Sequence, residues 1–144
     1  MLVGEFSENL KIGIIIQARM LSTRLPGKVL KRIIANDTML DCVINRVKYS
    51  RVNNIIVATS TKTEDDVIAK YCQDHQITCY RGSEENVLER YYLAAKKYNL
   101  DIIIRITSDC PLIDPFLIND MTQKFIEDHN HDYMSNIIER TYPR

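Results

Sequence analysis

A basic loop near the start of the chain has residue types and spacing suited to holding phosphate. Its basic residues, with no acidic residue among them, are Lys11, Arg19, Arg24, Lys28, Lys31 and Arg32. Arginine presents a planar fork of donors that matches phosphate oxygens, whereas lysine acts as a mobile point charge. Ser22 adds a hydroxyl donor, and Pro26-Gly27 predicts a turn that returns Lys28 toward the arginines. Such a loop could hold a triphosphate and neutralise charge as a phosphoryl bond breaks.

Two familiar phosphate loops are excluded by the order of these residues. The fingerprint GxGxxG is absent, because the first apolar run continues into Gln17-Ala18-Arg19. The Walker pattern fails because Val29 follows Gly27-Lys28 and no glycine lies five residues before Gly27. On charge alone, the alternative is a solvated loop that makes surface ion pairs. The position after a buried strand favours the phosphate site.

A candidate carboxylate follows the last apolar run of the chain. Asp109 stands about three residues beyond that run, where a carboxylate can hold Mg²⁺ against phosphates bound by the basic loop. Asp114 has a structural explanation instead, because Asp114-Pro115 is an ordinary helix start. Asp109 has no comparable structural explanation, so we expect it to be the metal ligand.

The segment from Arg81 to Tyr91 offers weaker candidates. Gly82 permits close approach of a ligand to the backbone, although a plain strand-to-helix turn explains it equally well. Asn86 and Arg90 are polar residues of the same segment without a defined role.

The composition limits the classes of protein to which the chain can belong. Its 144 residues suit one domain with a hydrophobic core. The 19 basic and 19 acidic residues cancel, so no global field attracts nucleic acid or an anionic membrane. The longest apolar run, residues 12–16, is far below the roughly 20 residues that a membrane-spanning helix needs. Residues 1–10 lack the basic start of a secretory signal and are expected to be a disordered leader.

The cysteines indicate a reducing compartment. No CxxC spacing joins them, and the expected state is reduced, mostly buried thiol for Cys42, Cys72, Cys79 and Cys110. We therefore expect a cytoplasmic protein.

Apolar runs of two kinds alternate along the chain. Short β-branched runs predict strands over residues 12–16, 55–59, 77–80 and 102–106. Helical spacing follows each run, and the expected helix-opening residues are Asp37 or Thr38, Thr63, Ser83 and Asp114. In the helix after Ser83, the residues expected to face inward are Val87, Leu88, Tyr91, Tyr92 and Ala95. This alternation predicts an α/β domain over residues 11–144 with a mostly parallel sheet and helices on both faces.

The predicted sheet indicates where the site should lie. In open α/β sheets, ligands bind outside the carboxyl ends of the strands. The loops after Ile16, Thr59 and Ile106 lie at that edge, and the first and third carry the basic loop and Asp109.

Three motifs together resemble a known family. The segment Ala18-Arg19-x-x-Ser22-x-Arg24-Leu25-Pro26-Gly27-Lys28 is similar to the signature loop of the cytidylyltransferases that activate acidic sugars, such as the CMP-Kdo and acylneuraminate synthetases. Gly82-Ser83-Glu84 with Val87-Leu88-x-Arg90-Tyr91, and Asp109-Cys110-Pro111-Leu112-Ile113-Asp114, resemble the spore coat polysaccharide biosynthesis protein F branch. The resemblance covers about residues 12–144.

The resemblance implies a fold, a reaction and roles for particular residues. The fold is the GT-A-like (Rossmann-like) fold of nucleotide-diphospho-sugar transferases. The reaction is attack of a sugar hydroxyl on the α-phosphate of CTP, which releases pyrophosphate. In this family Arg19, Arg24 and Lys28 would contact the triphosphate with help from Ser22, and Asp109 would hold Mg²⁺. The backbone around Ala18 and the loop with Gly82 would lie near the base, and the protein would be a homodimer.

Two departures from the family pattern qualify this expectation. The Kdo branch places Gln-Gly before Asp-x-Pro-Leu-Ile, whereas this chain has Thr107-Ser108, so base and sugar recognition would differ. Family members also continue well beyond 144 residues, with a sugar-binding half and a second metal-binding aspartate. The chain is therefore expected to be the N-terminal, nucleotide-binding part of a longer enzyme.

Two other functions remain open from the sequence. A glycosyltransferase on the same fold would bind a finished nucleotide sugar, which needs fewer cations than a triphosphate. A nucleotide-binding module without turnover would retain the basic loop and Asp109 but not the reaction.

Overall fold

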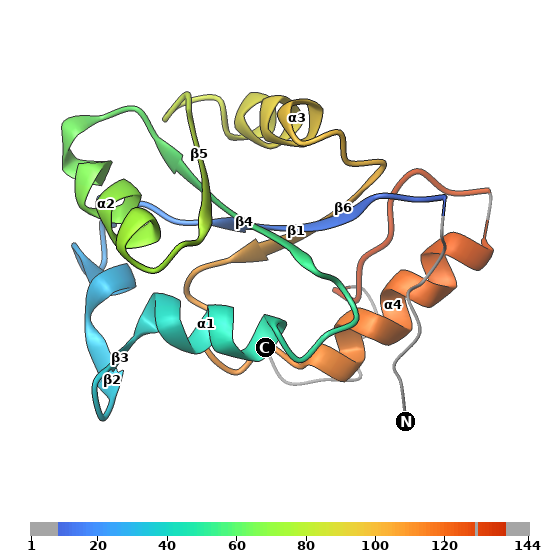
Figure 1. The fold of residues 1–144 in the computed structure, drawn as a ribbon, viewed down its shortest axis with the longest axis horizontal. Helices are drawn as coiled ribbons and strands as arrows, with labels where there is room; N and C mark the ends of the chain where they lie inside the picture. The colour runs from blue at the N-terminus through green and yellow to red at the C-terminus, as the bar shows by residue number, and fades with distance from the viewer. Residues whose placement is uncertain (1–8, 129, 138–144) are drawn as a thin grey trace.

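The structure is a computed structural model that describes residues 9–128 and 130–137. At its centre lie four strands in the order β5-β4-β1-β6, and every neighbouring pair is parallel (Figure 1). The strands are β1 (Ile12–Gln17), β4 (Asn54–Ser60), β5 (Thr78–Gly82) and β6 (Ile102–Thr107). In β1, Ile14, Ile15 and Ile16 are fully buried, as a β-branched run covered on both faces should be.

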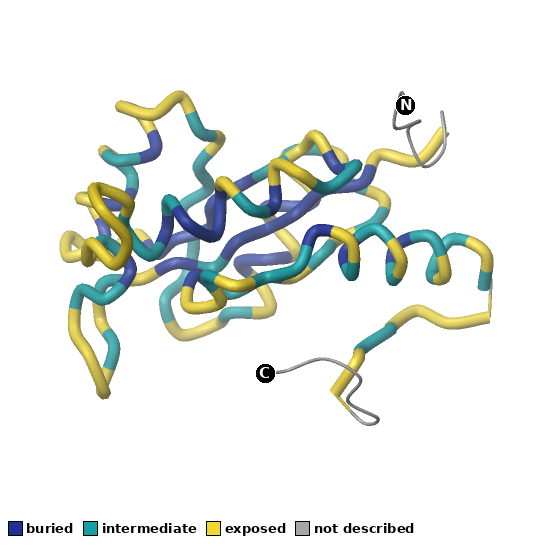
Figure 2. The backbone as a smooth tube through the Cα atoms, turned by 90° about the horizontal axis from the view of Figure 1, so that it is seen from below, coloured by how far each residue is buried: buried dark blue, intermediate teal, exposed yellow. Residues whose placement is uncertain are grey.

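Helices cover both faces of this sheet, so the predicted fold class is confirmed. Side chains of α1 (Met39–Val47), α2 (Asp66–Asp74) and α4 (Pro115–Glu127) pack with Ile14 and Ile16 in one core. On the other face, α3 (Val87–Lys97) packs with Ile15. Figure 1 shows α3 alone above the sheet and α1 and α4 below it, and Figure 2 shows buried strands between exposed helix surfaces.

The strand order creates a place for a ligand beside β1. Successive strands β1, β4 and β5 extend the sheet in one direction, and the chain then returns to add β6 on the opposite side of β1. The loops that follow β1 and β6 therefore leave the sheet side by side, and they lead to α1 and α4 on the same face. Such a reversal of strand order is where open α/β sheets bind ligands. This edge forms the left-hand side of Figure 1.

The start and the buried face of α3 differ from the prediction. Asn86, not Ser83, caps the helix, because its side chain accepts from the Glu89 N–H at 3.0 Å. Ser83 instead accepts from the Asn86 N–H. Leu88 and Tyr92, which were expected to face inward, are exposed. Arg90 and Ala94 are buried in addition to the predicted Tyr91 and Ala95.

Three other expectations need correction. Thr63 does not open α2; it lies in a 3-10 turn, Thr63–Asp65, that precedes the helix. Strand β6 is not covered on both faces, because Ile103 and Arg105 are exposed. A two-stranded antiparallel hairpin, β2 (Arg32–Ile34) with β3 (Asp37–Thr38), lies where only a loop was expected. Of the expected leader, residues 1–8 lie outside the described residues.

The predicted cap of α1 carries a testable consequence for stability. Thr38 and Asp41 form a capping box, in which the Asp41 carboxylate also accepts from the Thr38 hydroxyl and from the Tyr71 hydroxyl of α2. Asp41→Ala should lower the free energy of unfolding by about 1–3 kcal/mol, because the cap and two hydroxyl partners are lost together. Tyr71→Phe removes one of these bonds and should cost about 1 kcal/mol. Urea unfolding measures both; an equal loss in the two variants would contradict the shared role of Asp41.

Candidate functional site

Lys28 and Asp109 meet where the loops after β1 and β6 leave the sheet. Lys28 Nζ donates to Asp109 Oδ2 at 2.5 Å, and the two side chains are 28% and 44% exposed. Thr107, the last residue of β6, donates from Oγ1 to Asp109 Oδ1 at 2.7 Å. The hydrogen bonds from the Lys28 ammonium and from Thr107 hold the pKa of Asp109 below its ordinary value. Two residues predicted separately from sequence thus lie in direct contact.

The backbone of the basic loop is fixed at both of its ends. After β1, the Ala18 N–H donates to the Ala58 carbonyl of β4 at 3.0 Å, and Ala18 is buried. The Gly27 N–H then donates to the Met20 carbonyl at 2.8 Å, which closes the loop just before Lys28. Gly27 has φ of 71°, a left-handed conformation that favours glycine. The Pro26-Gly27 turn therefore delivers Lys28 to Asp109.

The other predicted triphosphate contacts lie on the exposed part of this loop. Arg19 and Arg24 are exposed, Ser22 is half-buried, and neither arginine forms an ion pair with the described residues. Both guanidinium groups are therefore available to a ligand. Their contact with a triphosphate stays a prediction.

The loop after β5 combines a tight glycine with a buried arginine. A Cβ on Gly82 would lie 2.9 Å from Tyr80 Cε1 and 3.1 Å from Arg90 Cγ, so a side chain there would displace its neighbours. Arg90 is only 1% exposed, and its Nη1 donates to the Ser83 carbonyl at 2.6 Å. Its Nε and Nη2 have no partner among the described residues, and burial lowers the pKa of the guanidinium. Arg90 thus holds the loop that contains Gly82.

Asp65 is a buried carboxylate at this edge that the sequence did not single out. It lies in the 3-10 turn after β4 and is 3% exposed. Its Oδ1 accepts from the Met20 N–H at 2.7 Å, and its Oδ2 accepts from the Ser60 N–H at 3.2 Å and from the Ser60 hydroxyl at 2.5 Å. The only available signal was its place in the loop after the strand at residues 55–59.

Asp109 also suits the expected magnesium ion. Mg²⁺ prefers oxygen ligands and is commonly held by one or two carboxylates together with substrate phosphates and water. Asp109 presents a partly exposed carboxylate beside the loop expected to hold phosphates. No group of three or more His, Cys, Asp or Glu suited to a metal occurs within residues 9–128 and 130–137.

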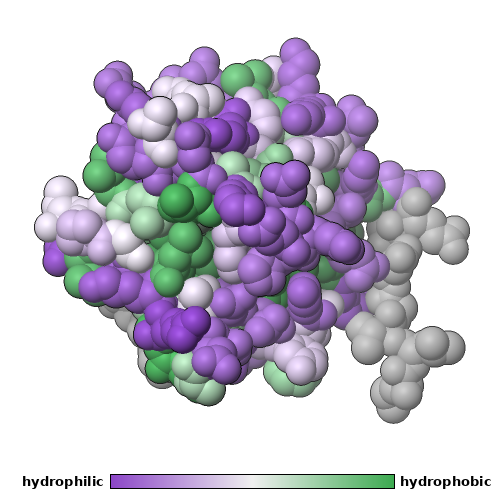
Figure 3. Space-filling model, turned by 60° about the vertical axis from the view of Figure 1, so that its left-hand side comes forward, coloured by the Kyte–Doolittle hydropathy of each residue, from purple (hydrophilic) through white to green (hydrophobic). Residues whose placement is uncertain are grey.

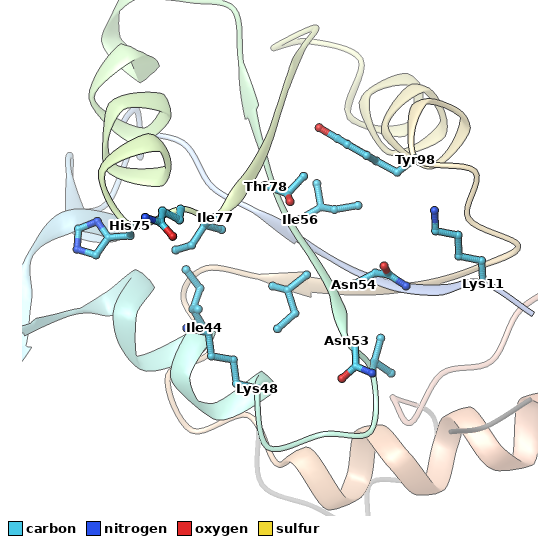
Figure 4. A pocket seen from close by; sticks show the side chains of 13 residues that line it. Lys11, Ile44, Lys48, Asn53, Asn54, Ile56, His75, Ile77, Thr78 and Tyr98 are labelled. Carbon is cyan, nitrogen blue, oxygen red and sulfur yellow. The ribbon is translucent and has the colours of Figure 1, made fainter. Parts of the chain in front are cut away.

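A cavity of about 390 Å³ lies at the other edge of the sheet and is not this site. It is lined by residues at the amino ends of β1, β4 and β5, including Lys11, Asn54 and Thr78 (Figure 4). Figure 3 brings the carboxyl edge forward and shows many hydrophilic side chains around a small apolar area. Because Lys28 and Asp109 follow the carboxyl ends of their strands, the candidate site and the cavity lie at opposite edges of the sheet.

Comparison with known proteins identifies relatives for most of the chain. A family model described as "Cytidylyltransferase" matches residues 13–142. Spore coat polysaccharide biosynthesis protein SpsF of Bacillus subtilis is 41% identical over 124 residues, which cover 83% of this chain and 51% of that protein.

Solved structures agree with the sequence matches. A cytidylyltransferase from Leptospira borgpetersenii superposes with a TM-score of 0.79 and 39% identity, covering 85% of this chain and 51% of that one. A CMP:2-keto-3-deoxy-manno-octonic acid synthetase complexed with CTP gives a TM-score of 0.70 and 26% identity, covering 82% and 48%. The chain therefore shares their α/β nucleotidyltransferase fold and spans about half of their length. Within the described residues, no helix is long and apolar enough to cross a membrane.

Proposed function

Since the chain belongs to the cytidylyltransferase family, we propose that it supplies the CTP-binding part of an enzyme that transfers CMP to a sugar. The sugar is acidic or otherwise modified, pyrophosphate is released, and the product serves polysaccharide synthesis for a spore coat or cell surface. The names of the relatives, a spore coat polysaccharide biosynthesis protein and a CMP-sugar synthetase complexed with CTP, support this proposal.

The observation that carries the proposal is the contact between Lys28 and Asp109 at the strand-order reversal. A mobile cation and a carboxylate that can hold a metal are the two groups that a triphosphate bound there requires. Arg19 and Arg24 extend the cationic surface along the same loop. A triphosphate needs more cations than a nucleoside diphosphate sugar, which favours nucleotidyl transfer over glycosyl transfer.

The residues of the loop have distinct roles in the proposed complex. Arg19, Arg24 and Lys28 bind the phosphates, and the Ser22 hydroxyl donates to a phosphate oxygen. The backbone at Ala18 and the loop with Gly82 lie against the base. Asp109 holds Mg²⁺, which when bound supplies charge neutralisation at the phosphate oxygens.

The proposed reaction is an attack of a sugar hydroxyl on the α-phosphate of CTP. A new oxygen–phosphorus bond forms as the bond to the pyrophosphate oxygen breaks, and the hydroxyl proton passes from the sugar to water. Negative charge grows on the departing pyrophosphate, where the cations of the loop stabilise it. In the proposed complex Lys28, which contacts Asp109, also donates to phosphate oxygens. Positioning and charge neutralisation by these residues supply the rate enhancement.

Two further properties belong to the same proposal. A cytoplasmic location is supported by the free cysteines, since Cys42, Cys72, Cys79 and Cys110 form no disulfide. A homodimer is expected from the family resemblance. Light scattering measures the oligomeric state directly.

The test combines binding with turnover. Calorimetry of the chain with CTP, UTP, ATP and GTP, with and without Mg²⁺, should give tightest binding for CTP with Mg²⁺. Pyrophosphate release is then measured after mixing CTP with a panel of acidic sugars. Tighter binding of a nucleotide sugar than of CTP, without pyrophosphate, would favour a glycosyltransferase. CTP binding without release from any sugar would favour a nucleotide-binding module.

A further inference from the structure

The buried Asp65 lies at the junction of two loops that border the proposed nucleotide site. Both of its carboxylate oxygens accept hydrogen bonds, one from the loop after β1 and the other from the end of β4. Residues 20 and 65 are far apart in sequence, so this contact ties together two loops that β-sheet pairing alone does not fix. A carboxylate that is 3% exposed needs such partners, because a buried charge without them is strongly unfavourable.

The backbone of Met20 connects Asp65 to the turn that precedes Lys28. Its N–H donates to Asp65 Oδ1 at 2.7 Å, and its carbonyl accepts from the Gly27 N–H at 2.8 Å. Gly27 directly precedes Lys28, whose ammonium contacts Asp109. A continuous path of hydrogen bonds and backbone therefore runs from Asp65 through Met20 and Gly27 to Lys28.

Asp65 itself is too deeply buried to contact a ligand on the surface of the loop. It is buried, whereas the loop residues on either side of Met20, namely Arg19 and Leu21, are exposed. Its influence on a bound nucleotide must therefore be exerted through the backbone of the loop.

We propose that Asp65 is a positioning residue that fixes the triphosphate loop through the Met20 amide. This inference rests on the proposed function, because it assigns to Asp65 the placement of Arg19 and Lys28 against phosphates. If Asp65 were purely structural, its replacement would lower the stability of the protein and weaken the binding of all nucleotides alike. If Asp65 positions this loop, its replacement should selectively weaken the binding of the β- and γ-phosphates.

The test compares CTP with CMP in three variants. Asp65→Ala removes the acceptor of the Met20 amide and should lower the ratio of CTP to CMP affinity by about tenfold, the scale of one charge-assisted hydrogen bond. Asp65→Asn retains a single carbonyl acceptor and should give a smaller loss. Ser60→Ala is the matched control, because it removes a neighbour of Asp65 but leaves the bond to Met20. Its affinity ratio should stay within about twofold of wild type, since the charged acceptor remains.

The outcomes separate this inference from the proposed function. An unchanged CTP-to-CMP ratio in a folded Asp65→Ala protein would overturn the role of Asp65. If the wild-type chain binds no CTP, the proposed function is wrong. Amide hydrogen exchange measured by NMR then tests whether Asp65 fixes the loop. Met20 and Gly27 amides should be protected in wild type and in Ser60→Ala, and Asp65→Asn should accelerate their exchange. Rapid exchange of the Met20 amide in wild type would also overturn the inference, including when Asp65→Ala fails to fold.

Discussion

Lys28→Met should weaken CTP binding by about 1.5–3 kcal/mol, the range for hydrogen bonds to charged groups. Methionine retains most of the apolar stem and removes only the ammonium, so the fold should be preserved. The loss has two sources. The phosphates lose a cation, and Asp109 loses the partner that neutralises it, which leaves a carboxylate near the incoming phosphates.

The matched control for this variant is Lys31→Met. Lys31 belongs to the same basic segment and is exposed, but it forms no ion pair with the described residues. Removal of its charge changes the net charge of the protein by the same amount. Calorimetry with CTP should therefore show a large loss for Lys28→Met and a small one for Lys31→Met. Equal losses would mean that only the general charge of the segment matters.

Asp109→Asn should abolish the dependence of CTP binding on Mg²⁺. The low pKa of Asp109 keeps the carboxyl ionised at neutral pH, so wild type presents a charged ligand to the metal. We expect Mg²⁺ to raise the affinity of wild type for CTP by about tenfold or more, and that of Asp109→Asn by less than about twofold, because a neutral amide is a poor ligand for a hard divalent cation.

Without Mg²⁺ the same variant should bind CTP at least as tightly as wild type. The substitution removes a negative charge from beside the phosphates and releases Lys28 from its ion pair. The control is Asp114→Asn, because Asp114 caps α4 by accepting from the Phe116 N–H at 2.8 Å and asparagine is an equally good cap. Its Mg²⁺ dependence should equal that of wild type. A surviving Mg²⁺ effect in Asp109→Asn would remove Asp109 from the metal site.

The sequence predicted the sheet and the closeness of Lys28 and Asp109 for the same physical reason. Buried parallel strands are β-branched runs, and loops after such runs meet at one edge whatever the details of packing. The positions of Lys28 and Asp109 in loops after two such strands, with the Pro26-Gly27 turn that returns Lys28, therefore predicted that they lie close together. Their direct contact was not foreseen, because two groups expected to share a ligand need not touch.

The residues that escaped prediction depend on partners distant in sequence. Nothing near Asp65 indicates that its acceptor oxygens serve the amide of Met20, which lies on another loop. In α3, a hydrophobicity pattern selects Leu88 and Tyr92 for the core. The helix instead turns Arg90 inward, where it donates to the carbonyl of Ser83. Sequence patterns locate apolar stripes, but they underestimate polar side chains that are buried because a backbone group needs them.

The position of β6 beside β1 also links ligand binding to the pairing of these two strands. Lys28 and Asp109 are 81 residues apart, and Asp109 reaches Lys28 only when β6, the last of the described strands, has paired with β1. A partly folded chain with β1, β4 and β5 in place retains the basic loop but lacks its carboxylate. A nucleotide whose binding needs both groups stabilises the completed sheet alone, by an amount that grows with its concentration. CTP with Mg²⁺ would then favour the pairing of β6 with β1. The protection of the β6 amides from hydrogen exchange would rise when CTP and Mg²⁺ are added.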